Sequence, residues 1–294
     1  MSVRKDFDAA VAAHQAATGH WETARARLGD GPAAELSDRQ RRLITQLAQA
    51  ATVVTPGMLG RALTDVESAT LAEATADQPL AVRIGECVGD ADSRFPVVVN
   101  LLGTGHVVID GAASDDRVRS LVQSIPLRLL ATRPSDSLSV SFVDPSGSVF
   151  ADFAPLLEAG YIPQVATDTE GLSTGLTQAD EQLTRAARTG GSGADLPERL
   201  IVHAGIPEGA GAAVERLGRL ASTGPAARLH LVLAGWPGPA IDNATYISVT
   251  PGRVQVAGVP LPVSVDRAPS GEVVRGLCAR LAEADPWSIK DIPQ

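Results

Sequence analysis

Short runs of apolar residues alternate with longer amphipathic stretches along most of the chain. The runs are short enough for strands and are bounded by Gly, Pro, Asp or Ser, which predicts strands at 80–84, 95–101, 106–110, 138–143, 200–203, 229–234, 246–249, 253–256 and 263–265. The last three are expected to form a hairpin set. Apolar side chains at helical spacing predict helices at 115–131, 169–188, 211–222 and 271–283. This alternation indicates an α/β fold with a mainly parallel sheet and helices on both of its faces.

The first part of the chain has a different pattern, without strand-like runs. Apolar positions from about residue 4 to 52 recur at helical spacing, and the segment 29–32 interrupts them with Gly and Pro. A turn and an acidic, Ala-rich stretch follow. We therefore expect an N-terminal helical hairpin and linker at 1–77, and the α/β domain at 78–294.

Composition and charge restrict the partners of this fold. Hydrophobic residues make up 44% of the 294 residues and aromatic residues only 3%, so the core must consist mainly of Leu, Val, Ile and Ala. The formal net charge is −9, whereas a sequence-independent DNA binder normally has a basic surface. DNA is therefore disfavoured as a partner. Lysine occurs only at Lys5 and Lys290, so neither lysine can serve a phosphate site in the centre of the chain.

The cysteines and the hydropathy profile indicate the cellular compartment in which we expect the protein. Cys87 and Cys278 are far apart and lack metal-ligand spacing, so we expect both to be buried apolar residues in a reducing compartment. No stretch has the pattern of a signal peptide or the length of a transmembrane helix. These features predict a cytoplasmic protein without a membrane partner.

The stretch 106–130 reads as an apolar strand, a small-residue turn and an amphipathic helix. Its spacing fits the phosphate-loop motif G-x-x-x-x-G-K-[ST], whose glycines and lysine bind phosphates and whose hydroxyl binds Mg²⁺. The candidate nucleotide-binding residues are Gly111, Ala112, Ala113, Ser114, Asp115, Asp116, Arg117 and Val118. In this pattern Asp116 replaces the second glycine, Arg117 the lysine and Val118 the hydroxyl residue. Two carboxylates repel a triphosphate, and we expect Asp115 or Asp116 to cap the helix instead.

Five segments resemble, in order, the motor domain of FtsK/SpoIIIE-type DNA translocases, in the HerA/FtsK group of RecA-like P-loop ATPases. They are the strand and phosphate loop His106–Val118, the "IDPK"-like Ser141-Phe-Val-Asp-Pro-Ser-Gly147, the stretch 153–168, the Walker B-like Leu196-Pro-Glu-Arg-Leu-Ile-Val-His-Ala-Gly205, and the sensor-strand segment Gly224-Pro-Ala-Ala-Arg-Leu-His-Leu-Val-Leu-Ala-Gly-Trp-Pro237. No single segment is specific, but five in this order and spacing are. The resemblance covers about residues 80–284 and implies a RecA-like sheet.

The resemblance also shows where catalytic residue types are missing. The acid that holds magnesium in the family aligns with Ala204, and the glutamate that polarises the attacking water aligns with Gly205. The arginine of the family's "GRA" sequence aligns with Pro225, and Gly235 and Trp236 replace the polar residues after the sensor strand. The joint loss of these groups argues against ATP hydrolysis.

The other candidate site residues have structural interpretations. Asp144 stands in the family's IDPK position, where it forms a turn before Pro145 or remains as a pocket residue. His106, His203 and His230 lie on or beside predicted strands. A shared zinc site is one interpretation, and buried core or strand-end histidines are the other, which we favour. There is no Gly-x-Ser-x-Gly nucleophile elbow.

Taken together, these patterns predict a catalytically inactive FtsK/SpoIIIE-like domain, without a cofactor, that serves as a protein-interaction or assembly module. Its expected partner is an active FtsK/HerA-family ATPase or a second copy of itself. The alternative is a divergent DNA translocase that binds ATP with magnesium and DNA. A third hypothesis, a passive DNA-binding module, is disfavoured by the net charge of −9.

Overall fold

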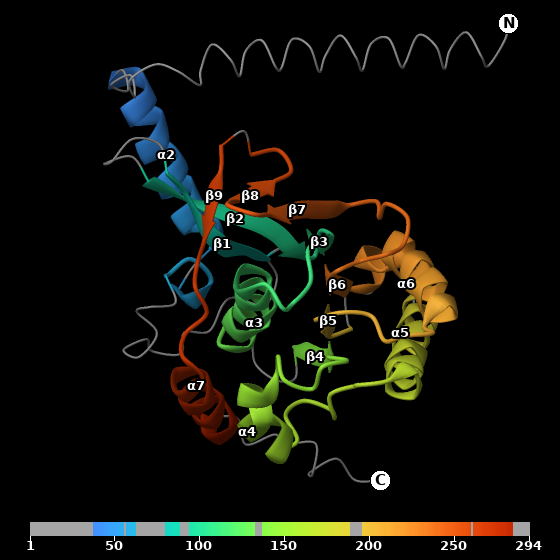
Figure 1. Cartoon of the computed structure of the whole chain (residues 1–294). Coiled ribbons are helices and arrows are strands. Elements are labelled where there is room, and N and C mark those ends of the chain that lie inside the picture. The colour runs from blue at the N-terminus through green and yellow to red at the C-terminus, as the bar shows by residue number, and fades with distance from the viewer. Residues whose placement is uncertain are drawn as a thin grey trace, which may run out of the picture. The chain divides into compact units, whose positions relative to one another are not determined.

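The computed structural model describes residues 38–55, 57–62, 80–88, 94–132, 137–188, 196–259 and 261–284 (Figure 1). The strands are β1 (Leu80–Val88), β2 (Arg94–Leu102), β3 (His106–Asp110), β4 (Leu138–Val143), β5 (Glu198–His203), β6 (Leu229–Ala234), β7 (Ala244–Thr250), β8 (Arg253–Val256) and β9 (Val263–Val265). The helices are α2 (Asp38–Val54), α3 (Asp116–Leu130), α4 (Ala154–Glu158), α5 (Thr169–Arg188), α6 (Gly211–Thr223) and α7 (Gly271–Ala284). Short 3-10 turns are η1 (Gly57–Leu59), η3 (Ala151–Phe153) and η4 (Pro225–Ala227). Every strand and long helix predicted from residue 80 onward is present, and α4 lies in a stretch for which no strand or helix was predicted.

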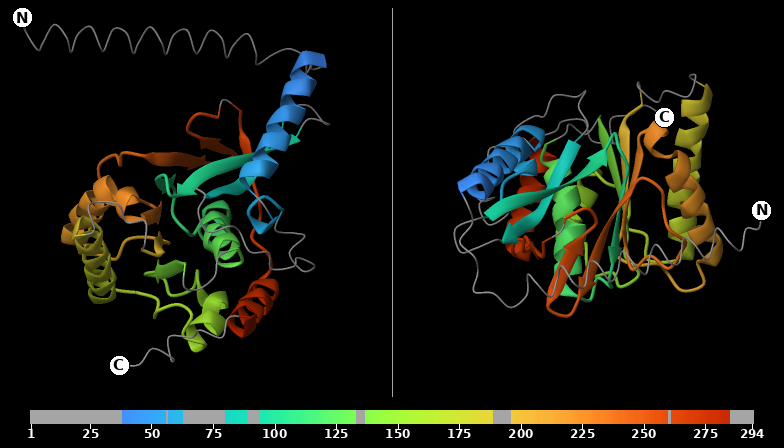
Figure 2. Two further views of the ribbon diagram at one scale, coloured as in Figure 1. Left: turned by 180° about the vertical axis from the view of Figure 1, so that it is seen from behind. Right: turned by 90° about the horizontal axis from the view of Figure 1, so that it is seen from above.

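The main sheet has six strands in the order β4-β5-β6-β3-β7-β8, and all of its neighbouring pairs are parallel except β7 and β8. Alternate residues of a strand face opposite sides. Thus Val107 and Ile109 of β3 join the core around α3, whereas Val108 joins the core under α5 and α6. Figure 2 shows these helices on the two sides of the sheet. The predicted mainly parallel α/β fold is confirmed.

A second, three-stranded sheet has the order β2-β1-β9 and is antiparallel. The prediction that β9 completes a hairpin set with β7 and β8 is therefore wrong, although β7 and β8 do form the predicted antiparallel pair. A strand of three residues has too little pattern to identify its partner. In the structure, β9 pairs with residues 85–87 of β1, where the lack of a side chain on Gly85 admits the backbone of Ser264.

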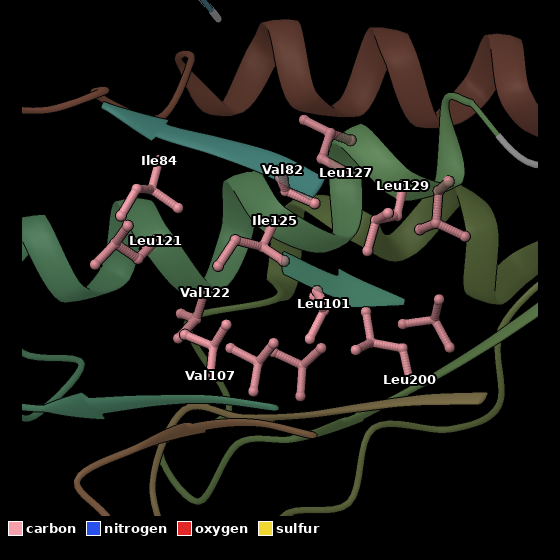
Figure 3. Packing of buried hydrophobic residues seen from close by; sticks show 14 of the residues in the cluster. Val82, Ile84, Leu101, Val107, Leu121, Val122, Ile125, Leu127, Leu129 and Leu200 are labelled. Atoms are coloured by element: carbon pink, nitrogen blue, oxygen red, sulfur yellow. The ribbon is translucent and has the colours of Figure 1, made fainter. Parts of the chain in front are cut away.

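Helix α3 is the central packing element, because it lies between the two sheets (Figure 3). Val82 of β1 lies on one side of it, and Leu101 of β2, Val107 of β3 and Leu200 of β5 lie on the other. Every residue from Leu121 to Leu130 is buried, including the polar ones. Contact on both sides explains why this helix is apolar around most of its circumference.

The most deeply buried charge on α3 is Arg128, whose side chain is 0% exposed. It donates hydrogen bonds to the carbonyl oxygens of Met58 and Arg61 and to Asp266, at 2.7 Å. Asp266 also accepts from Arg83 of β1 at 2.9 and 3.0 Å. Burial lowers the pKa of Arg128 to about 10, against the attraction of Asp266. These contacts join α3, β1 and the chain after β9.

Both cysteines are buried, as predicted, and burial raises the pKa of Cys278 to about 12. Helix α2 corresponds to the second helix of the predicted hairpin, whereas the first helix lies in residues 1–37, outside the described part. The division of the chain at residue 78 stays a prediction. Among the helices that the structure describes, none is both long enough and apolar enough to cross a membrane.

Candidate functional site

Residues 111–115 connect β3 to α3 at the carboxyl end of the parallel strands, the edge where such sheets bind ligands. The predicted strand, turn and helix of this stretch are confirmed. Asp115 is the N-cap of α3, and its carboxylate accepts a hydrogen bond from the backbone N–H of Arg117 at 2.9 Å. The expected capping role therefore belongs to Asp115, while Asp116 is in the first helical turn with a side chain 93% exposed.

The side chain of Arg117, at the lysine position of the motif, is fixed by hydrogen bonds to other residues of the chain. Its Nε and Nη2 donate to the carboxylate of Asp115 at 3.0 and 2.6 Å, and its Nη1 donates to the carbonyl oxygen of Thr250 at 2.9 Å. Hydrogen bonds from the Arg117 side chain and backbone lower the pKa of Asp115 to about 2. The guanidinium is thus neutralised by the adjacent acid and tied to the end of β7.

Val118, at the hydroxyl position of the motif, is a core residue. Its side chain is 0% exposed, and a Cβ placed on Gly111 would lie 2.8 Å from Val118 Cγ2. Gly111 is therefore needed for close packing of the loop onto its own helix, a role that involves no phosphate. Because Val118 presents only methyl groups and points into the protein, it offers no ligand to a metal ion.

The end of β5, aligned with the Walker B strand, has no acid. After His203, the chain continues through Ala204, whose N–H donates to Val143 at 2.9 Å, and Gly205, with φ +149°. His203 is 0% exposed, and burial lowers its pKa to about 4. It is therefore neutral near pH 7 and supplies no charge to this edge of the sheet.

Asp144 follows the edge strand β4 and is 1% exposed. Its carboxylate accepts hydrogen bonds from the Ser146 N–H and hydroxyl at 3.0 and 2.7 Å, and from the Val149 and Phe150 N–H groups at 2.7 and 3.4 Å. The predicted turn-forming role is confirmed. Asp144 also lines a cavity of about 200 Å³, but its oxygens are already engaged by the chain.

The three strand histidines are buried, as we favoured, and the residues described contain no group of three metal-ligating side chains. His106 Nδ1 accepts from the Leu231 N–H at 3.0 Å, so its Nε2 donates to the carbonyl oxygen of Ala221 at 2.9 Å. Burial lowers the pKa of His106 to about 4. These two bonds leave neither ring nitrogen free for a metal.

His230 forms part of a buried charge cluster that the sequence did not predict. Its Nδ1 lies 2.8 Å from the carbonyl oxygen of Gly105, and its Nε2 lies 2.9 Å from Glu198, whose other oxygen pairs with Arg228 at 3.1 Å. The cluster joins the starts of β5 and β6 to the turn before β3, at the edge opposite the candidate loop. The only signal for it in the sequence is a charged residue at the first position of a buried strand.

Comparison with known proteins identifies the fold. No family model and no curated protein matches the chain. Among solved structures, EssC (ATPases 2 and 3) from Geobacillus thermodenitrificans superimposes with a TM-score of 0.54 at 14% identity, over 76% of this chain and 52% of that one. The cytoplasmic domain of the Thermomonospora curvata type VII secretion ATPase EccC gives 0.56 at 16% identity, over 80% and 36%. The chain has the fold of FtsK/SpoIIIE-type ATPase domains.

A third structure, Thermomonospora curvata EccC (ATPases 2 and 3) in complex with a signal sequence peptide, gives a TM-score of 0.51 at 18% identity, over 71% of this chain and 48% of that one. The chain thus spans about half or less of the length of these solved proteins. At such identities the likeness concerns the fold.

Proposed function

We propose that this chain is a non-hydrolysing FtsK/SpoIIIE-like domain that acts as a protein-interaction or assembly module. The observation that carries the proposal is the pairing of Arg117 with Asp115 at 2.6 Å. A phosphate loop needs a free cation above the helix N-terminus. Here the cation is Arg117, and it is bound to the carboxylate of Asp115. The negative charge at the helix N-terminus is therefore supplied by a side chain of the protein itself.

Two further positions support the absence of hydrolysis. Val118 is buried where the family has a magnesium hydroxyl, and Ala204 and Gly205 stand where it has two acids. ATP hydrolysis requires charge stabilisation by a metal ion and a residue that orients the attacking water. We infer that the fold is retained for its surface rather than for this chemistry.

Two observations support the interaction role: the nature of the similar solved structures and the exposed apolar side chains of α2. One solved neighbour is a type VII secretion ATPase, two contain ATPases 2 and 3 of their proteins, and one of these is in complex with a signal sequence peptide. In this chain α2 exposes Leu47 (45%), Val53 (78%) and Val54 (47%), which are large apolar side chains. We propose that the partner is an active FtsK/HerA-family ATPase or a second copy of this chain.

Calorimetric titration with ATP and Mg²⁺ tests the nucleotide part of this proposal. We expect no binding at micromolar ATP, for the wild type and for Asp115→Ala alike, because freeing Arg117 restores neither a metal ligand nor an acid. Micromolar affinity that requires Mg²⁺ would favour the alternative, a divergent ATP-dependent DNA translocase.

Light scattering coupled to size exclusion tests the assembly part. The wild type is compared, alone and mixed with an FtsK-type ATPase from the same genome, with the variants Val53→Glu and, as a matched surface control, Thr52→Glu. We expect a complex that Val53→Glu weakens more than Thr52→Glu. A monomer that forms no complex under either condition would contradict the assembly role.

A further inference from the structure

A cavity of about 750 Å³ lies beside the first turns of α3. Its walls come from α3, from the turn between β7 and β8, and from the chain between β9 and residue 269. Six of its 15 lining residues are charged: Asp116, Arg117, Arg119, Arg253, Asp266 and Arg267. Four of these six are arginines, although the whole chain has a net charge of −9.

Contacts within the chain cancel part of this charge. Arg117 is paired with Asp115 at 2.6 Å, and Arg119 lies 3.4 Å from Asp116. Asp116 is 93% exposed, so its carboxylate points mainly to solvent. These two pairs therefore add little net charge to the cavity.

The two other arginines, Arg253 and Arg267, are not neutralised by any residue that the structure describes. Both oxygens of Asp266 are engaged by Arg83 and one of them also by Arg128, so this acid is not available to the cavity. Neither Arg253 nor Arg267 has an ion-pair or hydrogen-bond partner for its guanidinium among the residues described. The Nε of Arg253 is buried as well, and a buried donor without a partner is unfavourable unless a ligand or water satisfies it.

We propose that this cavity binds a small phosphate-bearing anion through Arg253 and Arg267. Two unpaired guanidinium groups match a phosphate group, which carries a charge of about −1.5 to −2 near pH 7, better than they match a single carboxylate. The planar fork of arginine donates two parallel hydrogen bonds to such a group. The volume lies within the range of about 300–1,000 Å³ that is typical of small-molecule sites.

The geometry of the β7–β8 turn explains how Arg253 reaches this position. Thr250 and Arg253 are paired across the turn, and Pro251 and Gly252, with φ +77° at the glycine, occupy its centre. Arg253 therefore begins β8 beside the start of α3. Because the arginines supply the positive charge, the binding requires no metal ion.

Titration calorimetry with inorganic pyrophosphate in metal-free buffer tests the proposal. The wild type is expected to bind, and Arg253→Gln and Arg267→Gln are each expected to weaken binding by about tenfold or more, the effect of losing a charge-assisted hydrogen bond. Ribose 5-phosphate, titrated in parallel, shows whether the site prefers an esterified or a free phosphate, and tight binding of either supports the proposal. Circular dichroism confirms that the variants are folded.

Arg280→Gln is the matched control, because it removes the same charge from an exposed position on α7 outside the cavity. We expect it to leave the pyrophosphate affinity unchanged. Equal weakening by Arg280→Gln and Arg253→Gln, binding that persists in both cavity variants, or a hexaglutamate peptide that binds more tightly than pyrophosphate would each overturn the proposal. None of these outcomes depends on ATP hydrolysis, so they can be separated from failure of the proposed function.

Discussion

At the residue scale, Asp115 sets the properties of the candidate site. It caps α3 through the Arg117 N–H and binds the Arg117 guanidinium through both of its oxygens. The positive end of the helix and the neighbouring cation are therefore both satisfied by a side chain of the same loop.

The lowered pKa of Asp115 predicts a pH-dependent contribution to stability. Because its folded pKa is about 2, below the value of about 3.9 for a free Asp, the contribution is present above about pH 4 and is lost as the pH falls toward 2. Asp115→Asn keeps a capping oxygen but has no charge. Urea denaturation should show a stability difference below about 1 kcal/mol at pH 7 that shrinks between pH 4 and 2. A difference that does not change with pH would contradict this role.

Asp266 is predicted to matter much more for stability. Asp266→Asn leaves Arg128 buried without a counter-charge and removes one of the two acids that pair with Arg83, and breaking a buried ion pair costs about 3–5 kcal/mol. Asp180→Asn is the control, because it breaks the more exposed pair with Arg216 and should cost about 0–1 kcal/mol. Equal shifts of the urea midpoint in the two variants would show that the buried network is not a major source of stability.

At the scale of elements, the unit from β3 to α3 could be predicted because the hydrophobic period changes from strand to helix across a turn of small residues. The pairing of β9 with β1 could not, since a run of three residues matches many partners. The burial of Arg128 could not be predicted from the sequence either. Arginine is usually exposed, and this one is enclosed only because α3 contacts both sheets. Arg253 and Arg267 come together only through the path of the chain around β8 and β9.

Packing of the loop on its helix makes a prediction for Gly111. A Cβ on this residue would lie 2.8 Å from Val118 Cγ2, so Gly111→Ala should destabilise the protein by about 1–3 kcal/mol. In a Val118→Ala background that methyl group is gone, and the same substitution should cost less. Urea denaturation of the four proteins gives the coupling energy. Additive effects would contradict the proposed contact.

At the scale of the whole molecule, the chain has an FtsK/SpoIIIE-type ATPase fold, and we propose that the residues at its ligand-binding edge do not support ATP hydrolysis. The fold could be expected from five segments in order. The arrangement of the Arg117 side chain could not, because its hydrogen bond to Thr250 joins residues far apart in sequence.

The net charge of −9 further predicts that duplex DNA will not bind at physiological salt.

Steady-state phosphate release from Mg²⁺-ATP, with and without duplex DNA, tests the central claim most directly. We predict release equal to the protein-free background under both conditions. Release above background that duplex DNA stimulates, that EDTA abolishes and that Arg117→Ala reduces would show an active ATPase and would contradict the account.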